Sequence, residues 1–425
     1  MKKTITLSLC FVINFFLLGQ SNNPQLSSWL LNTTGATGYD GLPANVQKVQ
    51  YSENYVYISS SGIPEYSIGP WPGDPNDAVN QNFVFKIPRN PREETGTKTS
   101  TPLGVTAVLI NGVAIFNAKD ANSYKNQGIW HSNAVVVEAS SFDDCLGHPQ
   151  EQGVYHYHQN PICVYSMDST KHSPIIGYAF DGYPIYGAFG YTNPDGSGGI
   201  KRMISSYRLR NLTQRTSLPD GTQLSASEYG PDVSAQYPLG YYVEDYEYVD
   251  SSGDLDQYNG RFTVTPEYPN GTYAYFVTTN YHDSSAYPYL IGPQYYGTVV
   301  GENNQTQGHA TINEPVTDYN PATGIKTQNN NFVKNYSLSQ NYPNPFNPAT
   351  TITYSISSVE TRHALPVRLD VYDVFGKIVT TLVNKKQNPG TYHVTFNADN
   401  LSSGVYFYRL QAGKFIQTKK LVILK

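Results

Sequence analysis

The pattern of hydrophobic and polar positions predicts short β-strands through most of the chain. Residues 51–59 alternate as Y-S-E-N-Y-V-Y-I-S, and this period of two places apolar side chains on one face of a strand. Residues 105–116 hold Asn111-Gly112 between two apolar runs, and Asp181-Gly182 likewise separates two apolar runs. Both dipeptides are typical of the tight turn of a β-hairpin. The first part of the chain is therefore expected to be a β-dominated domain.

The composition of the sequence changes after residue 316. Residues 317–335 are rich in Asn and Thr and contain a run of three asparagines, a composition typical of a linker. Residues 336–425 then give short strands at regular spacing, separated by turn residues, as in a small β-sandwich. The expected fold class is all-β, with a large β domain at residues 21–316, a linker at 317–335 and a small Ig-like β-sandwich at 336–425.

The N-terminus has the layout of a secretory signal peptide. Lys2 and Lys3 precede an apolar run at residues 5–18, and polar residues follow it, so residues 1–20 are expected to be removed. The apolar run is too short for a membrane span, which takes ~20 apolar residues, and no later stretch approaches that length. We therefore expect a secreted or cell-surface protein without a membrane span once the signal is removed.

Cys145 and Cys163 are the two cysteines outside the signal peptide. An even pair in an exported protein favours a disulfide over a thiolate site. A disulfide here would close a loop, and by the chain-entropy argument it would stabilise the folded state by roughly 3 kcal/mol. The alternative is a pair of reduced, buried cysteines, which an oxidising compartment disfavours.

Composition and charge exclude several classes of function. Counts of 37 Tyr, 35 Gly and 28 Pro favour strands and turns over helices. Charged residues make up 14% of the chain and the net charge is −5, so no nucleic-acid partner and no polybasic membrane surface are expected. The sequence also lacks G-x-S-x-G, a Walker loop, a dinucleotide-binding glycine fingerprint and H-E-x-x-H. Standard hydrolases, nucleotide-binding enzymes and zincins are therefore disfavoured.

Three of the nine histidines lie in H-P-Q-E-Q-G-V-Y-H-Y-H, between the two cysteines. Because side chains alternate along a strand, His156 and His158 point to one face while Tyr155 and Tyr157 point to the other. His148 can return to the same face across the intervening turn. Neutral imidazoles bind zinc, copper, nickel or iron. We therefore predict a metal site formed by these three histidines.

Oxygen ligands could complete such a site. Bridged cysteines cannot supply thiolates, which leaves acidic side chains nearby and His131 as further candidates. The candidate carboxylates are Asp143, Asp144, Glu151 and Asp181. Copper or zinc is the expected cofactor. Calcium at residues 250–260 is disfavoured because Tyr258 falls where the EF-hand register needs an oxygen ligand. The alternative is that the histidines only form hydrogen bonds on a half-exposed strand.

The C-terminal ninety or so residues resemble a known sorting domain. The resemblance rests on L-S-Q-N-Y-P-N-P-F-N-P-A-T-T-I at residues 338–352, Y-D-V-F-G-K at 372–377, S-G-V-Y-F-Y-R-L at 403–410 and the basic end K-K-L-V-I-L-K. These segments are similar to the C-terminal sorting domain of bacterial type IX secretion (T9SS type A, Por secretion). The resemblance implies that residues 336–425 interact with the type IX secretion machinery, and that the protein is released or attached to the outer cell surface.

The first domain resembles the YHYH domain family. The resemblance rests on G-H-P-x-x-x-G-V-Y-H-Y-H at residues 147–158, G-Y-A-F-D-G-Y-P-I-Y-G at 177–187 and D-L-D-Q-Y-N-G-R at 254–261. The motif positions here are Tyr155, Tyr157, Gly177, Asp181, Gly182, Asp256, Asn259 and Arg261. The family has no settled activity, so the resemblance implies a fold and no reaction. Where some relatives repeat a histidine pair, residues 273–276 read Y-A-Y-F, which argues against a second metal centre.

Two functions therefore remain open, and the sequence does not decide whether the protein is an enzyme. The first is an extracellular protein that binds a transition metal through His148, His156 and His158. The second is a non-catalytic cell-surface module with structural histidines, in which exposed aromatic residues such as Trp71 and Trp130 stack on a glycan or a protein partner.

Overall fold

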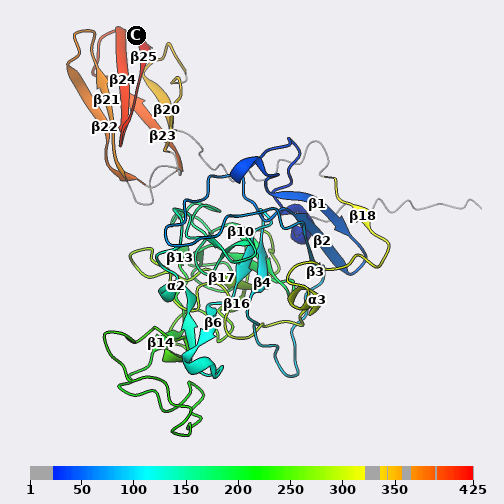
Figure 1. The fold of residues 1–425 in the computed structure, drawn as a ribbon. Helices are drawn as coiled ribbons and strands as arrows, with labels where there is room; N and C mark the ends of the chain where they lie inside the picture. The colour runs from blue at the N-terminus through cyan, green and yellow to red at the C-terminus, as the bar shows by residue number, and fades with distance from the viewer. Residues whose placement is uncertain (1–22, 321–335, 342, 357–364, 388–389, 425) are drawn as a thin grey trace, which may run out of the picture.

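A computed structural model describes residues 23–320, 336–341, 343–356, 365–387 and 390–424 (Figure 1). The expected signal peptide at residues 1–20 and most of the expected linker lie outside these residues. The structure is β-dominated, with 36% strand and 6% helix, as predicted. Among the described residues, no helix is long and apolar enough to cross a membrane. Two separate hydrophobic cores form, one from residues 29–295 and one from residues 338–423.

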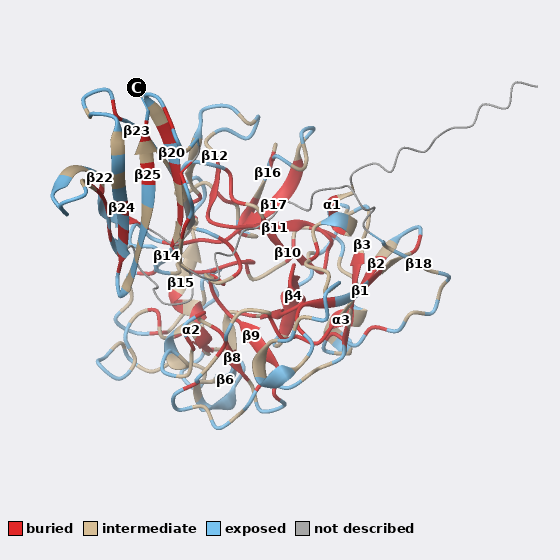
Figure 2. Cartoon of the chain, turned by 90° about the horizontal axis from the view of Figure 1, so that it is seen from above, coloured by how far each residue is buried: buried red, intermediate tan, exposed pale blue. Residues whose placement is uncertain are grey.

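The larger core surrounds an eight-stranded sheet of order β16-β17-β11-β10-β4-β5-β9-β8. Its strands are β4 (Val105–Leu109), β5 (Ala114–Phe116), β8 (His148–Pro149), β9 (Tyr155–Tyr157), β10 (Ile175–Ala179), β11 (Pro184–Tyr186), β16 (Gly260–Thr263) and β17 (Thr272–Phe276). Every residue of β4, β9, β10, β11 and β17 is buried, and Figure 2 shows this sheet at the centre of the buried residues. Both faces of the sheet are therefore covered, which explains the nearly continuous apolar runs in its strands.

Both predicted hairpins form in this sheet. Gly112 in the β4–β5 turn has φ +79°, and Gly182 in the β10–β11 turn has φ +86°. A Cβ atom at Gly182 would also lie 2.8 Å from the carbonyl oxygen of Pro88. Glycine is thus required at this turn both for its left-handed backbone and for the space it leaves.

The sheet contains two copies of one four-stranded unit. In each copy an antiparallel hairpin is followed by a strand that pairs in parallel with the second hairpin strand, and by an antiparallel partner of that strand. The copies are β4-β5-β9-β8 and β10-β11-β17-β16, and they meet where β4 pairs antiparallel with β10. Each hairpin even has a register shift at the same place, between Val105 and Ala107 and between Ile175 and Gly177.

The strand registers define which residues correspond in the two copies. Ile115 lies opposite Tyr157 in the first copy, as Ile185 lies opposite Tyr275 in the second. From these pairs and the antiparallel partners, Tyr155 corresponds to Tyr273, His156 to Ala274, His158 to Phe276 and His148 to Arg261. The second copy therefore repeats the tyrosines of the first copy without its histidines.

The loop before each outer strand is repeated as well. Asp143 accepts hydrogen bonds from the Gly147 N–H and the Tyr155 hydroxyl, and its own N–H donates to the Gly147 carbonyl oxygen. Asp256 makes the same bonds with Gly260 and Tyr273. Each loop is thus closed by one aspartate and fastened to the neighbouring strand by one tyrosine.

Smaller sheets and short helices complete the first unit. A four-stranded sheet of order β18-β1-β2-β3 comprises β1 (Val46–Tyr51), β2 (Tyr55–Ser60), β3 (Phe83–Pro88) and β18 (Thr317–Asp318). Three pairs are β6 (Lys119–Ser123) with β7 (His131–Asn133), β12 (Phe189–Tyr191) with β13 (Ile200–Arg202), and β14 (Tyr207–Leu209) with β15 (Tyr246–Tyr248). The helices are α1 (Pro24–Ser27), α2 (Ala134–Val137), α3 (Glu302–Gln305) and the 3₁₀ turns Tyr39–Gly41, Tyr124–Asn126 and Val243–Asp245.

Two boundaries differ from the sequence prediction. The expected strand at residues 51–59 is interrupted by a turn, because the Ser52 hydroxyl accepts hydrogen bonds from the N–H groups of Asn54 and Tyr55. β18 pairs with β1, so residues 317 and 318, the first two residues of the expected linker, are paired with a strand of the first unit.

The C-terminal unit is a sandwich of two sheets. One has the order β19-β20-β23 and the other β22-β21-β24-β25. The strands are β19 (Ser337–Leu338), β20 (Ala349–Ile356), β21 (Leu365–Tyr372), β22 (Ile378–Gln387), β23 (Gly390–Asn397), β24 (Gly404–Ala412) and β25 (Phe415–Ile423). Buried and exposed positions alternate in β20 and in the later part of β24, and the buried ones form the second core. The small β-sandwich predicted from strand spacing is confirmed.

Candidate metal centre

The structure brings His148, His156 and His158 together on one side of the β8–β9 pair. His148 lies directly opposite His156 in the antiparallel register, and His158 follows the end of β9. One nitrogen from each of the three rings lies within 4.8 Å of the others. All three side chains are buried. The convergence predicted from strand alternation and the intervening turn is therefore present.

The outer nitrogens of all three rings are tied to neighbouring groups. His156 Nδ1 lies 2.9 Å from the Val154 carbonyl oxygen, and His158 Nδ1 lies 2.5 Å from the Asn117 carbonyl oxygen. His148 Nδ1 lies 2.9 Å from Ser141 Oγ, whose own proton is donated to the Glu138 carbonyl oxygen at 2.7 Å. Because these partners accept, each Nδ1 carries a proton, and the lone pair available to a metal lies on Nε2 of each ring.

These lone pairs face one another. The Nε2 atoms of His156 and His158 are 2.9 Å apart, too close for two unshared acceptors in a dry site. The Nε2 of His148 is buried and has no hydrogen-bond partner among the described residues. A positive charge shared between these nitrogens would satisfy them together, which is what a metal ion does.

Glu138 supplies a fourth donor that the sequence reasoning missed. It follows α2, and its Oε2 lies 3.2 Å from His158 Nε2 and 3.3 Å from His148 Nε2. This oxygen is also buried without a hydrogen-bond partner in the described part of the chain. The four donors suit a first-row divalent ion, because bonds of about 2.0–2.1 Å place neighbouring tetrahedral ligand atoms roughly 3.3 Å apart.

Electrostatics keep two of these donors in the forms that bind a metal. Burial alone would raise the pKa of Glu138, but the His148 and His158 rings, when protonated, hold it well below its ordinary range, so the group is a carboxylate. Burial lowers the pKa of His156, and the neighbouring His158 and His148 rings lower it further, so this ring is neutral. A carboxylate and a neutral imidazole can bind a cation without first losing a proton.

A second layer of side chains fixes the orientation of the rings. Phe116 stacks on His156 with ring centroids 3.9 Å apart, and Phe142 meets His148 edge-on at 4.9 Å. Asp74 Oδ2 lies 3.4 Å from His148 Nδ1, on the side away from Nε2. Such partners hold a ligand in one tautomer and one direction.

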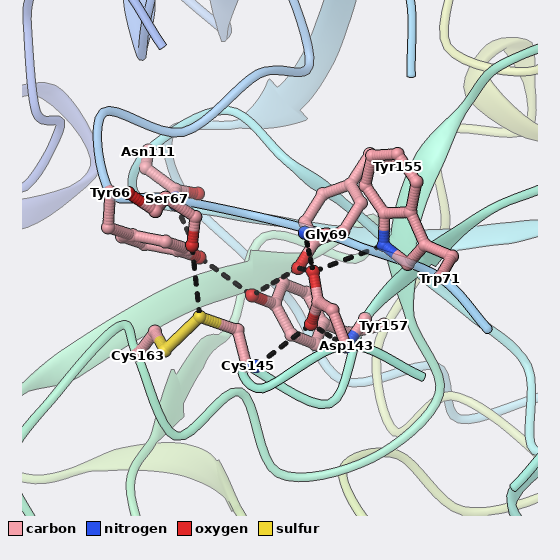
Figure 3. Close-up of a disulfide and its surroundings, with 11 residues drawn as sticks. Tyr66, Ser67, Gly69, Trp71, Asn111, Asp143, Cys145, Tyr155, Tyr157 and Cys163 are labelled. Carbon is pink, nitrogen blue, oxygen red and sulfur yellow. Dashed lines mark hydrogen bonds between the residues drawn. A yellow bond between two sulfur atoms is a disulfide. The ribbon is translucent and has the colours of Figure 1, made fainter. Parts of the chain in front are cut away.

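The opposite face of β9 is structural. Figure 3 shows the Cys145–Cys163 disulfide beside Asp143, Tyr155 and Tyr157, so the predicted bridge is confirmed. Asp143 accepts hydrogen bonds from five groups: the N–H groups of Gly69, Cys145 and Gly147, the Trp71 indole and the Tyr155 hydroxyl. Its carboxylate is therefore fully used in holding the loop and does not face the histidines.

The other candidate ligands lie outside the cluster. Asp144 and Glu151 are exposed. Asp181 accepts hydrogen bonds from the Tyr275 hydroxyl at 2.6 Å and the Gly297 N–H at 2.8 Å, and His131 pairs with Glu244 at 2.8 Å. The sequence offered each of these side chains as a candidate ligand, and the fold assigns Asp181 and His131 to other partners.

The later family-motif residues have structural partners. The Asn259 side chain donates to the carbonyl oxygens of Phe276 and Leu290. Arg261 donates to the carbonyl oxygens of Tyr191 and Thr192. These polar side chains fasten loops to the second copy of the unit.

The aromatic residues expected on the surface are buried. Trp71 is 7% exposed and Trp130 is 0% exposed. The Trp71 indole donates to Asp143, and the Trp130 indole donates to the Glu228 carbonyl oxygen. Neither ring offers the exposed face that stacking on a glycan or a partner requires, so this expectation is wrong.

Comparison with known proteins finds two families. Residues 84–287 match the family described as YHYH protein, and residues 340–424 match the secretion system C-terminal sorting domain. No curated protein matches the chain. Among solved structures, the sensor domain of the anti-sigma factor RsgI4 in Pseudobacteroides cellulosolvens is 13% identical, with a TM-score of 0.17 and coverage of 21% of this chain and 95% of that one. A likeness at this TM-score indicates nothing about the fold.

Proposed function

We propose that this chain, which matches the YHYH protein family over residues 84–287 and a secretion system sorting domain over residues 340–424, binds a transition metal through His148, His156 and His158. The sorting domain marks it for export to the cell surface or the medium through type IX secretion. The proposed ion would therefore be held outside the cell. Glu138 is the fourth protein donor.

The observation that supports this proposal most directly is the pair of orphaned polar atoms. Glu138 Oε2 and His148 Nε2 are buried, point toward the same place as the other two Nε2 atoms, and make no hydrogen bond within the described structure. A buried polar group without a partner costs about 1–3 kcal/mol. A bound cation would remove this cost for both atoms at once.

The second copy of the unit is an internal control for this argument. It forms the same loop, strands and tyrosine contacts with Arg261, Ala274 and Phe276 at the histidine positions. The fold itself therefore does not require histidine at these positions. A functional reason for the histidines of the first copy is correspondingly favoured.

The donor set suits zinc or copper better than calcium. Imidazole nitrogens are good ligands for zinc and copper, whereas calcium takes oxygen ligands. Four buried protein donors would fill a tetrahedral shell, which favours a structural or metal-holding role. If Glu138 swings away, an ion bound by the histidines would gain an open position and could act as a Lewis acid.

Metal content of the purified chain tests the proposal. The protein would be loaded with zinc or copper, freed of loose ions by gel filtration and measured by elemental analysis. We expect a single ion per chain. The variant His156→Ala/His158→Phe copies the second unit, so it should fold and lose the ion. His131→Ala, outside the cluster, should keep it.

Two results would count against metal binding. One is a wild-type chain that holds no stoichiometric zinc or copper after loading. The other is equal metal in the His156→Ala/His158→Phe variant and the wild type, because the ion would then lie elsewhere.

A further inference from the structure

The solvent face of the C-terminal sandwich has an apolar patch at one end. The patch consists of Val374, Phe375, Ile378, Val405 and Phe407, all of which are exposed. Phe375 is 92% exposed, so almost none of its ring is used in the fold of the described chain. Outer faces of soluble sandwiches are mostly polar, and a contiguous apolar patch marks an interaction site or an aggregation hazard.

Strand register shows that these side chains are contiguous. Ile378 and Phe407 are both direct cross-strand partners of Tyr372, so the three side chains form a row on one face of the sheet. Val405 lies two residues before Phe407 on the same strand and therefore on the same face. Val374 and Phe375 form the turn that joins the strands of Tyr372 and Ile378. The apolar side chains on the strands are therefore continuous with those of the turn.

The turn fixes the backbone at Phe375, and the Phe375 side chain is exposed. The Asp373 side chain accepts hydrogen bonds from the N–H groups of Phe375 and Lys377, and Gly376 has φ +77°. The Asp373 N–H also donates to the Lys377 carbonyl oxygen. Because the backbone is already ordered and the side chain has few rotatable bonds, Phe375 suits the central anchor of an interface.

Basic residues lie at the edge of the patch. Lys377 is exposed beside Phe375, and Lys420 is exposed as the cross-strand partner of Phe407. A partner that fits this surface would have an apolar pocket for the two phenylalanines and acidic side chains at its rim.

We propose that this patch is the surface through which the sorting domain docks on the type IX secretion machinery. The family match supplies the class of partner, because a sorting domain is defined by being recognised for export. The patch offers such a partner exposed apolar side chains, and Phe375, at 92% exposed, is the one that the fold uses least. The proposal is independent of metal binding.

Export of the full chain from a bacterium with type IX secretion tests the proposal. Phe375→Glu and Phe375→Ser/Phe407→Ser should each lower the protein in the medium and on the cell surface at least about tenfold, with the chain retained in the periplasm. Ile416→Ser is the matched control, because Ile416 is exposed on the same sheet opposite Gln411, at the far end from the patch. Its export should equal that of the wild type.

Calorimetry of each purified variant separates docking from folding. Because Phe375 is exposed, Phe375→Glu should leave the unfolding temperature unchanged. If the double variant is unstable, the export of Phe375→Glu alone tests docking. Wild-type export of folded Phe375→Glu would overturn the proposal. So would a loss of self-association in that variant, measured by analytical ultracentrifugation, with export intact, since the patch would then bind a second copy of the chain.

Discussion

Asp143 and Asp256 occupy the same position in the two copies of the central unit. Each carboxylate accepts hydrogen bonds from the N–H of a glycine four residues later and from the hydroxyl of a strand tyrosine. In the first copy this arrangement positions the loop before His148. In the second copy it positions the loop before Arg261. The shared frame can therefore be tested separately from the metal chemistry.

Asp143→Asn and Asp256→Asn should both destabilise the fold. An asparagine amide would bring two donors into a position where N–H and O–H groups already point, leaving some of them without an acceptor. We expect a loss of about 2–4 kcal/mol in the free energy of unfolding for either variant. Urea denaturation gives this value, and a loss below 1 kcal/mol in both would mean that the loops are held by other contacts.

Ser141→Ala should weaken metal binding without abolishing it. The Ser141 hydroxyl accepts from His148 Nδ1 and so fixes the tautomer that presents Nε2 to the ion. Loss of such an outer partner typically lowers metal affinity about 10–100-fold. Competition with a chromophoric chelator measures the affinity. Ser225→Ala, in an exposed turn, is the control, and an equal affinity in Ser141→Ala would exclude the tautomer argument.

Bound metal should raise the thermal stability of the first domain. An ion that binds only the folded state adds about 2.7 kcal/mol when its free concentration is 100 times the dissociation constant. Calorimetry with added zinc and then with a chelator should show a rise and a reversal of the unfolding temperature. The His156→Ala/His158→Phe variant should show neither change, and a similar rise in that variant would place the stabilising ion elsewhere.

Removal of the disulfide should loosen the site together with the fold. Cys145 and Cys163 are 18 positions apart and enclose all three histidines. By the chain-entropy argument, Cys145→Ser/Cys163→Ser should cost roughly 3 kcal/mol in the free energy of unfolding. Urea titration measures the loss, and metal affinity should fall in the same variant. An unchanged affinity would show that β8 and β9 are held in place by the sheet alone.

Asp181 gives a pH dependence that is independent of the metal site. Burial raises the pKa of Asp181 from 3.8 to about 6, against the opposing effect of its hydrogen bonds from Tyr275 and Gly297. The folded state therefore binds this proton more tightly than the unfolded state. The resulting stabilisation is complete below about pH 4 and is lost as the pH rises through 6, by an amount on the order of 3 kcal/mol.

Carboxyl ¹³C NMR measures this pKa directly. The Asp181 resonance, assigned by its absence in Asp181→Asn, should titrate near pH 6. Urea denaturation at pH 5 and pH 8 should show a smaller difference in that variant than in the wild type. A midpoint near pH 4 would mean that the hydrogen bonds to this carboxylate from Tyr275, Gly297 and the Tyr183 N–H fully offset its burial.

The sequence predicted the parts of the site that are local in the chain. Alternation along a strand placed His156 and His158 on one face, and the short turn returned His148 to it. Secretion likewise predicted the disulfide. Glu138 was missed because it is separated from His148 by ten positions and reaches the site from the end of a short helix. No periodic pattern marks such a residue, since its position depends on how the helix packs.

The duplicated unit was also missed, although the sequence contains its signal. The segments N-G-V-A-I-F and D-G-Y-P-I-Y begin the two hairpin returns, and G-V-Y-H-Y-H and G-T-Y-A-Y-F form the two parallel strands. The spacing between these segments differs in the two copies because the second contains a longer insertion. A comparison at a fixed period therefore does not find the repeat, whereas the strand registers show it at once.

The second copy has the backbone of the first copy without its three histidines. Its strands already direct residues 261, 274 and 276 as the first copy directs its histidines, so a change in chemistry there needs new side chains and no new backbone. In a duplicated frame of this kind, side chains can change in one copy while the other copy still stabilises the sheet. The same chain thus offers protein engineers two equivalent starting points, one that carries the three histidines and one that does not.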